Sequence, residues 1–172
     1  TALQQISSFA SIQVAELPSV KTNQADFHRH IICIPETSTF DIEELFAHES
    51  PSLPPGIWDW LEVMSGIPRI TEATLEQFVP QMVNMESLHG IDFKKGCYPG
   101  QEIVARSQYR GTIKRRLQIA SVTMTETPKP STEIFHSDDP EQPCGMVVLS
   151  AKDPNNSNHI NLQVECKLDA LL

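Results

Sequence analysis

The sequence has no long apolar run, few aromatic residues and no closely spaced cysteines. No stretch approaches the roughly 18 consecutive apolar residues of a membrane-spanning helix, so we expect no contact with a membrane. No basic and apolar leader is present, and nothing therefore indicates secretion. These absences favour a cytoplasmic protein.

The four cysteines are far apart, which argues against a disulfide framework and against a structural zinc site. Reduced thiols in a cytosolic protein are the simpler interpretation. His28 and His30 would share one side of a strand, but no third ligand lies nearby in the sequence. We therefore expect no metal site. The cysteines are Cys33, Cys97, Cys144 and Cys166.

Charge is distributed unevenly along the 172 residues. The chain has a formal net charge of −9, which argues against a surface that coats nucleic acid. Residues 94–116 nevertheless hold seven of the 13 lysines and arginines and a single acid, Glu102, so this basic segment carries +6 and the rest carries −15. A solvated basic face would explain the segment, but a local anionic partner explains it equally directly.

Hydrophobic patterns predict an α+β protein with a change of pattern near Gly111. Residues 1–111 are mixed, with helical stretches at 57–65 and 101–109, and residues 112–172 alternate as strands do. We expect the second part to form all or part of a small C-terminal antiparallel β-barrel. The other expected elements are a strand at 27–35, a short helix at 41–48, a turn from Thr74 to Phe78, a helical stretch at 81–89, strands from 114, at 144–151 and at 159–168, and a hairpin turn between the last two.

The most unusual stretch is KGCYPGQE, residues 95–102. It places Cys97 between two glycines and just before the expected helix 101–109, whose N-terminal N–H groups would stabilise a thiolate. In that helix we expect Ile103 and Val104 to be buried and Arg106 and Arg110 to lie on one side. Cys97 is therefore a candidate reactive thiol, although a small residue in a tight loop is the simpler alternative.

Residues 66–117 resemble the YgfZ family, folate-binding relatives of the T protein (aminomethyltransferase) of the glycine cleavage system. The resemblance rests on KGCYPGQE and on the flanking GIP, PQM-N and ARxxYRG elements. It implies ferredoxin-like parts around a folate cavity, followed by a C-terminal β-barrel. It also implies that this chain is a fragment that lacks an N-terminal portion of that fold.

The resemblance further implies a protein that binds tetrahydrofolate and supports the assembly or repair of iron–sulfur enzymes, including those that thiomethylate tRNA. Its partners would be folate and iron–sulfur client proteins, with no direct contact to tRNA. Cys97 would be the functional thiol. The remaining candidate residues would contact folate through its rings or its glutamate tail: Trp60, Lys95, Tyr98, Gly100, Gln101, Glu102, Arg106 and Arg110.

One position departs from the family pattern. Two residues before the glycine of GIP the T protein carries a glutamate that contacts the pterin, whereas this chain has Met64. A carboxylate accepts paired hydrogen bonds from the pterin and a thioether does not, so another group, such as Glu62, would have to replace it.

Two other functions stay open at this stage. The chain could be a folate-dependent aminomethyltransferase, although it does not show the acidic residue that the T protein uses. It could instead be an RNA-binding module that uses residues 94–116, although only Tyr98 and Tyr109 are interspersed among the cations.

Overall fold

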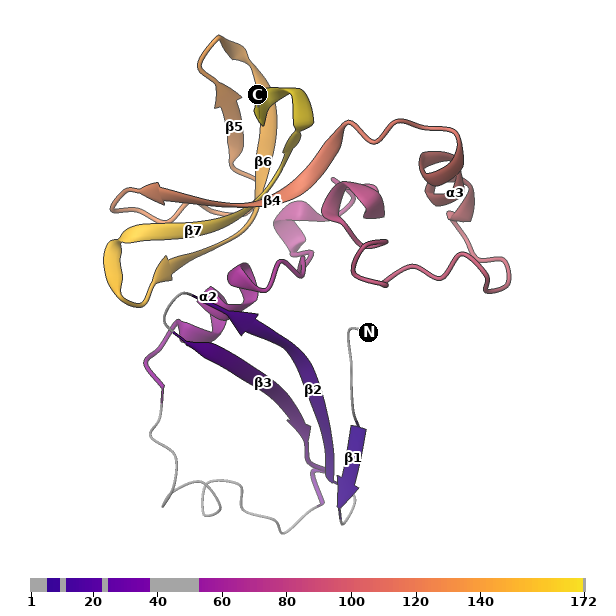
Figure 1. Cartoon of the computed structure of the whole chain (residues 1–172), viewed down its shortest axis with the longest axis vertical. Coiled ribbons are helices and arrows are strands. Elements are labelled where there is room, and N and C mark those ends of the chain that lie inside the picture. Colours follow the sequence, from indigo (N-terminus) through magenta and orange to yellow (C-terminus); the bar gives the residue numbers. More distant parts are fainter. Residues whose placement is uncertain (1–5, 10–11, 23–24, 38–52, 172) are drawn as a thin grey trace. The chain divides into compact units, whose positions relative to one another are not determined.

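Two antiparallel sheets joined by short helices are present in the computed structural model, which describes residues 6–9, 12–22, 25–37 and 53–171 (Figure 1). The chain divides into two compact units, Thr1–Ile57 and Trp58–Leu172, which are described separately below. The predicted α+β class is confirmed. The predicted change near Gly111 falls inside the second unit and stays a prediction about sequence pattern.

The first unit contains a three-stranded antiparallel sheet in the order β1-β2-β3. Its strand register shifts around Pro18, which has no N–H group to donate to a neighbouring strand. Arg29 is buried, and its Nη2 donates to the carbonyl oxygen of Pro18 at 3.2 Å. The strand predicted at 27–35 is confirmed, whereas the helix predicted at 41–48 lies outside the described residues. The strands are β1 (Ile6–Phe9), β2 (Ile12–Lys21) and β3 (Asp26–Cys33).

The second unit contains a four-stranded antiparallel sheet in the order β4-β7-β6-β5. The three strands and the hairpin predicted after residue 111 are confirmed, and β5 is an additional strand that the sequence did not predict. No pairing joins β4 to β5 among the described strands, so the closed barrel is not confirmed. The strands are β4 (Arg115–Thr123), β5 (Glu133–His136), β6 (Asp139–Asp153) and β7 (Asn156–Lys167).

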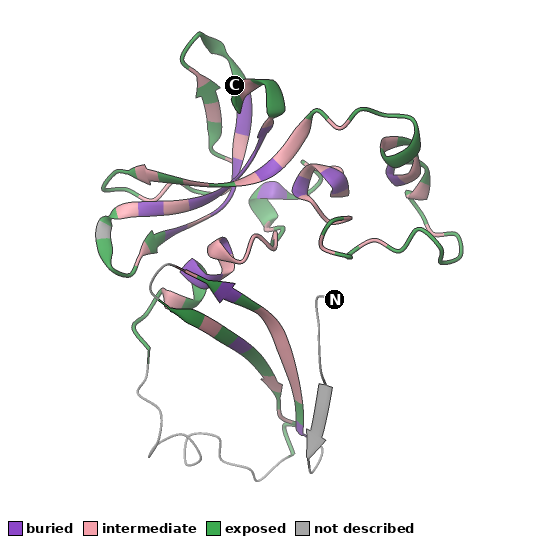
Figure 2. Cartoon of the chain, in the orientation of Figure 1, coloured by how far each residue is buried: buried purple, intermediate pink, exposed green. Residues whose placement is uncertain are grey.

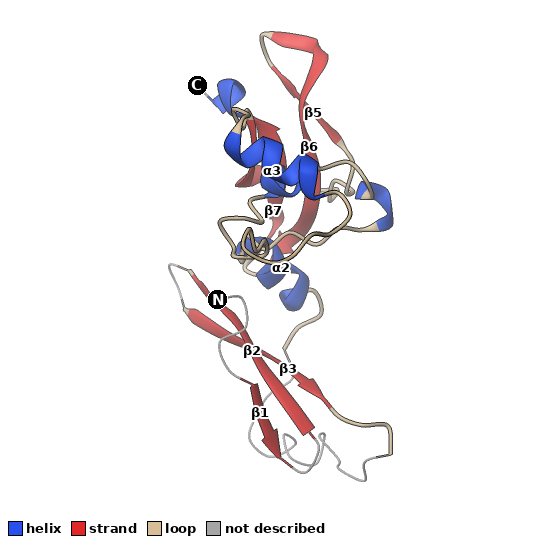
Figure 3. Cartoon of the chain, turned by 90° about the vertical axis from the view of Figure 1, so that its right-hand side faces the viewer, coloured by secondary structure: helices blue, strands red, loops and turns tan. Residues whose placement is uncertain are grey.

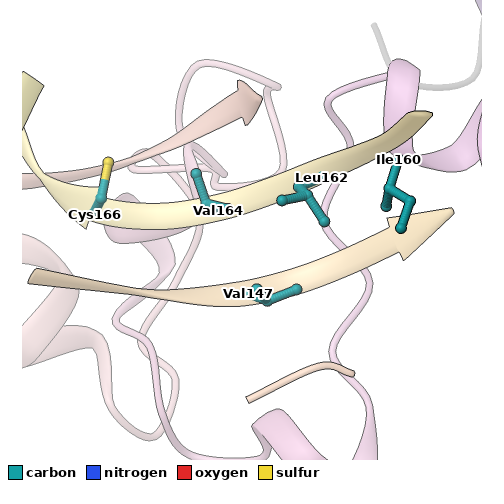
Figure 4. Close-up of a cluster of buried hydrophobic side chains, with 5 residues drawn as sticks. All are labelled: Val147, Ile160, Leu162, Val164 and Cys166. Atoms are coloured by element: carbon teal, nitrogen blue, oxygen red, sulfur yellow. The ribbon is translucent and has the colours of Figure 1, made fainter. Parts of the chain in front are cut away.

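One face of this sheet forms an apolar core. Side chains at alternate positions of β7 point to the same side, as the two-residue period of a strand requires. Ala120, Val122 and Ile134 pack against these buried residues from the neighbouring strands β4 and β5. Figure 4 shows the members of the cluster: Val147, Ile160, Leu162, Val164 and Cys166.

The other face of β7 holds polar side chains that fix helix α2 (Ile57–Met64) to the sheet. Gln163 is fully buried, and its Nε2 lies 3.0 to 3.2 Å from the carbonyl oxygens of three residues of α2 and the turn after it. The indole N–H of Trp60 donates to Oδ1 of Asn161 at 2.8 Å. A buried amide that satisfies several helix-end carbonyls replaces the missing hydrogen bonds at a helix terminus.

The remaining helices are short. The helix predicted at 101–109 is confirmed as α3, whereas only a short 3₁₀ turn forms where a helical stretch was expected at 81–89, and a second one lies near the turn expected at 74–78. Thr74 ends this second turn and does not begin it. In α2 the buried residues are Trp60, Leu61 and Val63, whereas the side chain of Trp58 is exposed. The other elements are η1 (Glu72–Thr74), η2 (Pro80–Val83), α3 (Gln101–Tyr109) and η3 (Leu168–Leu171).

Candidate functional site

The KGCYPGQE segment forms the loop that leads into α3 and the first two residues of that helix (Figure 3). Gly100 caps the helix in the left-handed conformation, with φ of 82°, which costs glycine nothing because it has no Cβ. Oε1 of Gln101 accepts a hydrogen bond from the backbone N–H of Tyr98 at 3.3 Å and folds the loop back onto the helix start. Cys97 lies in this loop with an exposed side chain.

A mainly apolar pocket of about 390 Å³ lies beside the loop. Its volume is within the range of about 300–1,000 Å³ that is usual for small-molecule sites. Lys95 and Tyr98 belong to its lining, and the Lys95 Nζ lies 4.6 Å from the centre of the Tyr98 ring, a cation–π distance. Asp92 is the one acid in a lining made of Pro68, Ile70, Phe78, Pro80, Val83, Met85, Gly90, Ile91, Asp92, Lys95, Tyr98 and Val104.

The structure divides the predicted folate-binding residues between several places. Lys95 and Tyr98 line the pocket, and α3 contributes Val104 to it. Arg106 and Arg110 follow Val104 by two and six positions, which puts them on the other side of a helix with 3.6 residues per turn. The two apolar residues of α3 differ in burial. Val104 is buried, as predicted, whereas Ile103 is 60% exposed, so its predicted burial is wrong.

The other predicted residues have placements of their own. Gly100, Gln101 and Glu102 form the start of α3. Trp60 is buried against the sheet through its bond to Asn161 and does not line the pocket. Glu62, the expected substitute for a carboxylate at Met64, already accepts from Nε1 of Trp58 at 3.1 Å and pairs with Arg69 at 3.0 Å.

Polar residues of the PQM-N element hold α3 and β4 in place, a role that the sequence did not reveal. Nε2 of the buried Gln81 donates to the carbonyl oxygen of Val104 at 2.7 Å. Nδ2 of Asn84 donates to the carbonyl oxygen of Leu117 at 2.9 Å. Nη1 of Arg116 donates to the backbone oxygen of Gln81 at 3.0 Å. In the sequence this element contributes only to the family resemblance, and its two amide side chains are the one signal of a structural role.

The basic segment 94–116 also separates into two groups. Arg115 makes a bidentate pair with the buried Glu165, at 2.5 and 2.8 Å, and this hydrogen bonding raises the pKa of Arg115 although burial opposes it. Arg116 pairs with Glu86. In the described part of the chain no ion pair involves the other five cations: Lys94, Lys95, Arg106, Arg110 and Lys114.

Comparison with known proteins agrees with the motif. No protein-family model matches the chain. The tRNA-modifying protein YgfZ of Photobacterium profundum is 49% identical over 72 residues, which is 42% of this chain and 22% of that protein. The protein of the same name from Colwellia psychrerythraea is 43% identical over 89 residues, or 52% of this chain and 27% of that protein. Part of this chain is therefore similar to the YgfZ proteins. The match spans about a quarter of their length.

The described residues also show neither a membrane-spanning helix nor a cluster of metal ligands. No helix there is long and apolar enough to cross a membrane. Within the same residues, no group of three histidine, cysteine, aspartate or glutamate side chains is arranged to hold a metal ion.

Proposed function

We propose that this YgfZ relative is an accessory protein in tRNA modification that binds tetrahydrofolate and uses Cys97 as its functional thiol. On this proposal it supports iron–sulfur enzymes. The observation that carries the proposal is the position of the exposed Cys97 between Lys95 and Tyr98, two residues that line a pocket of suitable size. The name of the curated relatives supports the link to tRNA modification.

The chemistry of the pocket suits a flat ring system with polar edges. Its lining is mostly apolar, and the Tyr98 ring offers a surface on which a pterin or aminobenzoyl ring can stack. Asp92 can provide the carboxylate that is missing at Met64: its Oδ1 accepts the N–H of Lys94 at 2.8 Å, and a carboxylate has acceptor sites to spare for a pterin amino group. The Lys95 ammonium would attract a glutamate tail.

Cys97 would act at the mouth of this site. One cysteine is too few to hold an iron–sulfur cluster, which requires several thiolates, so a client protein or a second protomer would have to supply the others. The loop presents Cys97 to the solvent, where such a partner can reach it.

A calorimetric titration of tetrahydrofolate into the protein under reducing conditions tests ligand binding. We expect saturable binding that weakens about tenfold in Tyr98→Ala, because an aromatic contact contributes about 1 kcal/mol beyond area burial. Asp92→Asn and Lys95→Ala should weaken binding as well. Lys94→Ala is the matched control, because this neighbouring lysine does not line the pocket. Binding that is equal in all four variants would reject the pocket as the folate site.

The thiol is tested separately with Cys97→Ser. This variant should bind tetrahydrofolate as the parent does, because Cys97 does not line the pocket, but it should fail to restore tRNA thiomethylation in cells that lack the protein. Full restoration by a well-expressed Cys97→Ser variant would remove the thiol from the mechanism.

A further inference from the structure

The solvent face of α3 carries cations and an aromatic ring that the pocket does not use. Arg106, Tyr109 and Arg110 are exposed, Tyr109 by 72%, and they line a shallow depression with Glu102 and Ala105. This depression shares no residue with the apolar pocket, to which α3 contributes Val104 from its other side.

A second aromatic residue reaches this face from the loop before KGCYPGQE. Phe93 meets Tyr109 edge to face, with ring centroids 6.0 Å apart and planes inclined by 69°. Phe93 is itself 39% exposed, and the next residue, Lys94, is one of the five cations without an ion pair in the described chain. The fold thus adds a further aromatic residue to a basic segment in which aromatic residues are few.

We propose that this face binds single-stranded RNA, with phosphates on Arg106 and Arg110 and a base stacked on Tyr109. The two arginines are one helical turn apart, which places their Cβ atoms about 5–6 Å from each other, and Tyr109 lies on the same side of the helix. A cationic track with an aromatic platform is the usual combination for single-stranded nucleic acid, because every base has a π-face. Arginine also offers a planar fork that matches phosphate oxygens.

The acidity of the chain does not oppose this binding, which revises the expectation from the sequence. Charges more than about 8–10 Å away are largely screened at physiological ionic strength, so only the local charges count. One acid, Glu102, lines the same depression. Its carboxylate should repel a phosphate. Removal of the charge of Glu102 should therefore increase the affinity for RNA.

The test is fluorescence anisotropy of a labelled 12-nucleotide single-stranded RNA with the full chain, over a range of salt concentrations. We expect binding that weakens steeply with salt, with a slope that falls by about 0.7 for each phosphate contact removed. Arg106→Glu combined with Arg110→Glu should reduce the affinity at least tenfold. The control pair, Lys129→Glu with Lys152→Glu, changes the net charge equally at exposed positions in the same unit and should have little effect.

Two further variants separate RNA from other polyanions. Tyr109→Ala should weaken RNA binding at least about fivefold, because stacking is lost, and should leave binding of a polyglutamate peptide unchanged. Glu102→Gln should strengthen RNA binding. Equal losses in the arginine pair and the lysine pair would overturn the proposal. Full competition between polyglutamate and RNA that does not depend on Tyr109 would also overturn the proposal, because the face would then bind an acidic polypeptide.

The outcome is independent of the folate proposal. The arginine pair lies outside the apolar pocket, so tetrahydrofolate titrations of the Arg106→Glu, Arg110→Glu variant should match those of the parent. Loss of RNA binding with intact folate binding supports the RNA surface. Loss of both in this variant would place the arginines in the folate site and overturn the assignment of a separate RNA face.

Discussion

The four-stranded sheet and residues 91–110 differ in how their polar and charged side chains are paired. In the sheet, the buried Glu165 is held by Arg115, and the buried amide of Gln163 meets three backbone carbonyls. In residues 91–110 the cations form no ion pair with another described residue, and all of them are exposed. Figure 2 shows the contrast, with buried residues along β4, β6 and β7 and exposed ones along the loop into α3. A group buried in a low-dielectric interior requires a partner, whereas an exposed group is free to bind one from outside.

The largest effect should come from Glu165→Ala. Removal of this carboxylate leaves Arg115 without its bidentate partner at a site where Glu165 is only 2% exposed. Breaking one side of a buried pair typically costs about 3 kcal/mol or more in the free energy of unfolding. Urea denaturation measures the loss, with Glu133→Ala on the exposed edge of β5 as the control. Equal losses in both variants would contradict the contrast.

A smaller loss is expected from Gly145→Ala. An added Cβ would lie 2.6 Å from the carbonyl oxygen of Glu165 and 2.9 Å from the Cβ of Cys166, so β6 and β7 would have to move apart. Such overpacking costs about 2 kcal/mol. Gly96→Ala is the control, because nothing lies within 4 Å of its added Cβ. A thermal melt of each variant compares a closely packed strand with an open loop.

Much of the sheet could be predicted from the sequence, and the reason is its regular period. The alternating residues of β4 and β7 and the apolar run at 144–151 in β6 predicted these strands. β5 was missed because four residues carry too short a pattern. The surroundings of KGCYPGQE were harder, since burial of Gln81 and exposure of Ile103 depend on contacts between segments that are distant in sequence.

A smaller effect than that of Gly145→Ala should follow from Gln81→Met. Gln81 hydrogen-bonds to α3, so this variant tests what anchors residues 91–110. The substitution removes the hydrogen bond from Nε2 to the carbonyl oxygen of Val104 and keeps the volume. We expect a loss of about 1 kcal/mol in the free energy of unfolding. Hydrogen exchange should also accelerate in α3 more than in β7. Gln108→Met on the exposed side of α3 is the control, and identical exchange in both variants would remove Gln81 as an anchor.

The smallest effects on stability concern the thiols, which differ mainly in reactivity. Cys97 and Cys33 are exposed and should react with a thiol reagent in the native protein, whereas Cys144 and Cys166 should react only after unfolding. Burial raises the pKa of the Cys166 thiol, and Glu165 and Cys144 add to the effect. The neutral Cys166 thiol contributes stability to the folded state. This contribution is fully present below the ordinary thiol pKa of about 8.5, which applies to the unfolded chain, and is lost as pH rises through the raised pKa of the folded protein.

This pH effect has its own measurement. Urea denaturation at pH 7 and at pH 10 should show a smaller loss of stability on alkalinisation in Cys166→Ala than in the parent. The matched variant is Cys97→Ala, which should show the same loss as the parent. Rapid native labelling of all four thiols would mean that the sheet is open in solution.

The two glycines that flank Cys97 differ in the backbone conformation that each position requires. The φ of 82° at Gly100 belongs to the mirror-image half of conformational space, while the space around its missing Cβ is empty. This position therefore requires a residue that tolerates a positive φ, and not a residue without a side chain. A D-alanine introduced at 100 by chemical ligation should preserve the loop, while its L-enantiomer should strain it, and residue 96 should not distinguish side chains on grounds of space.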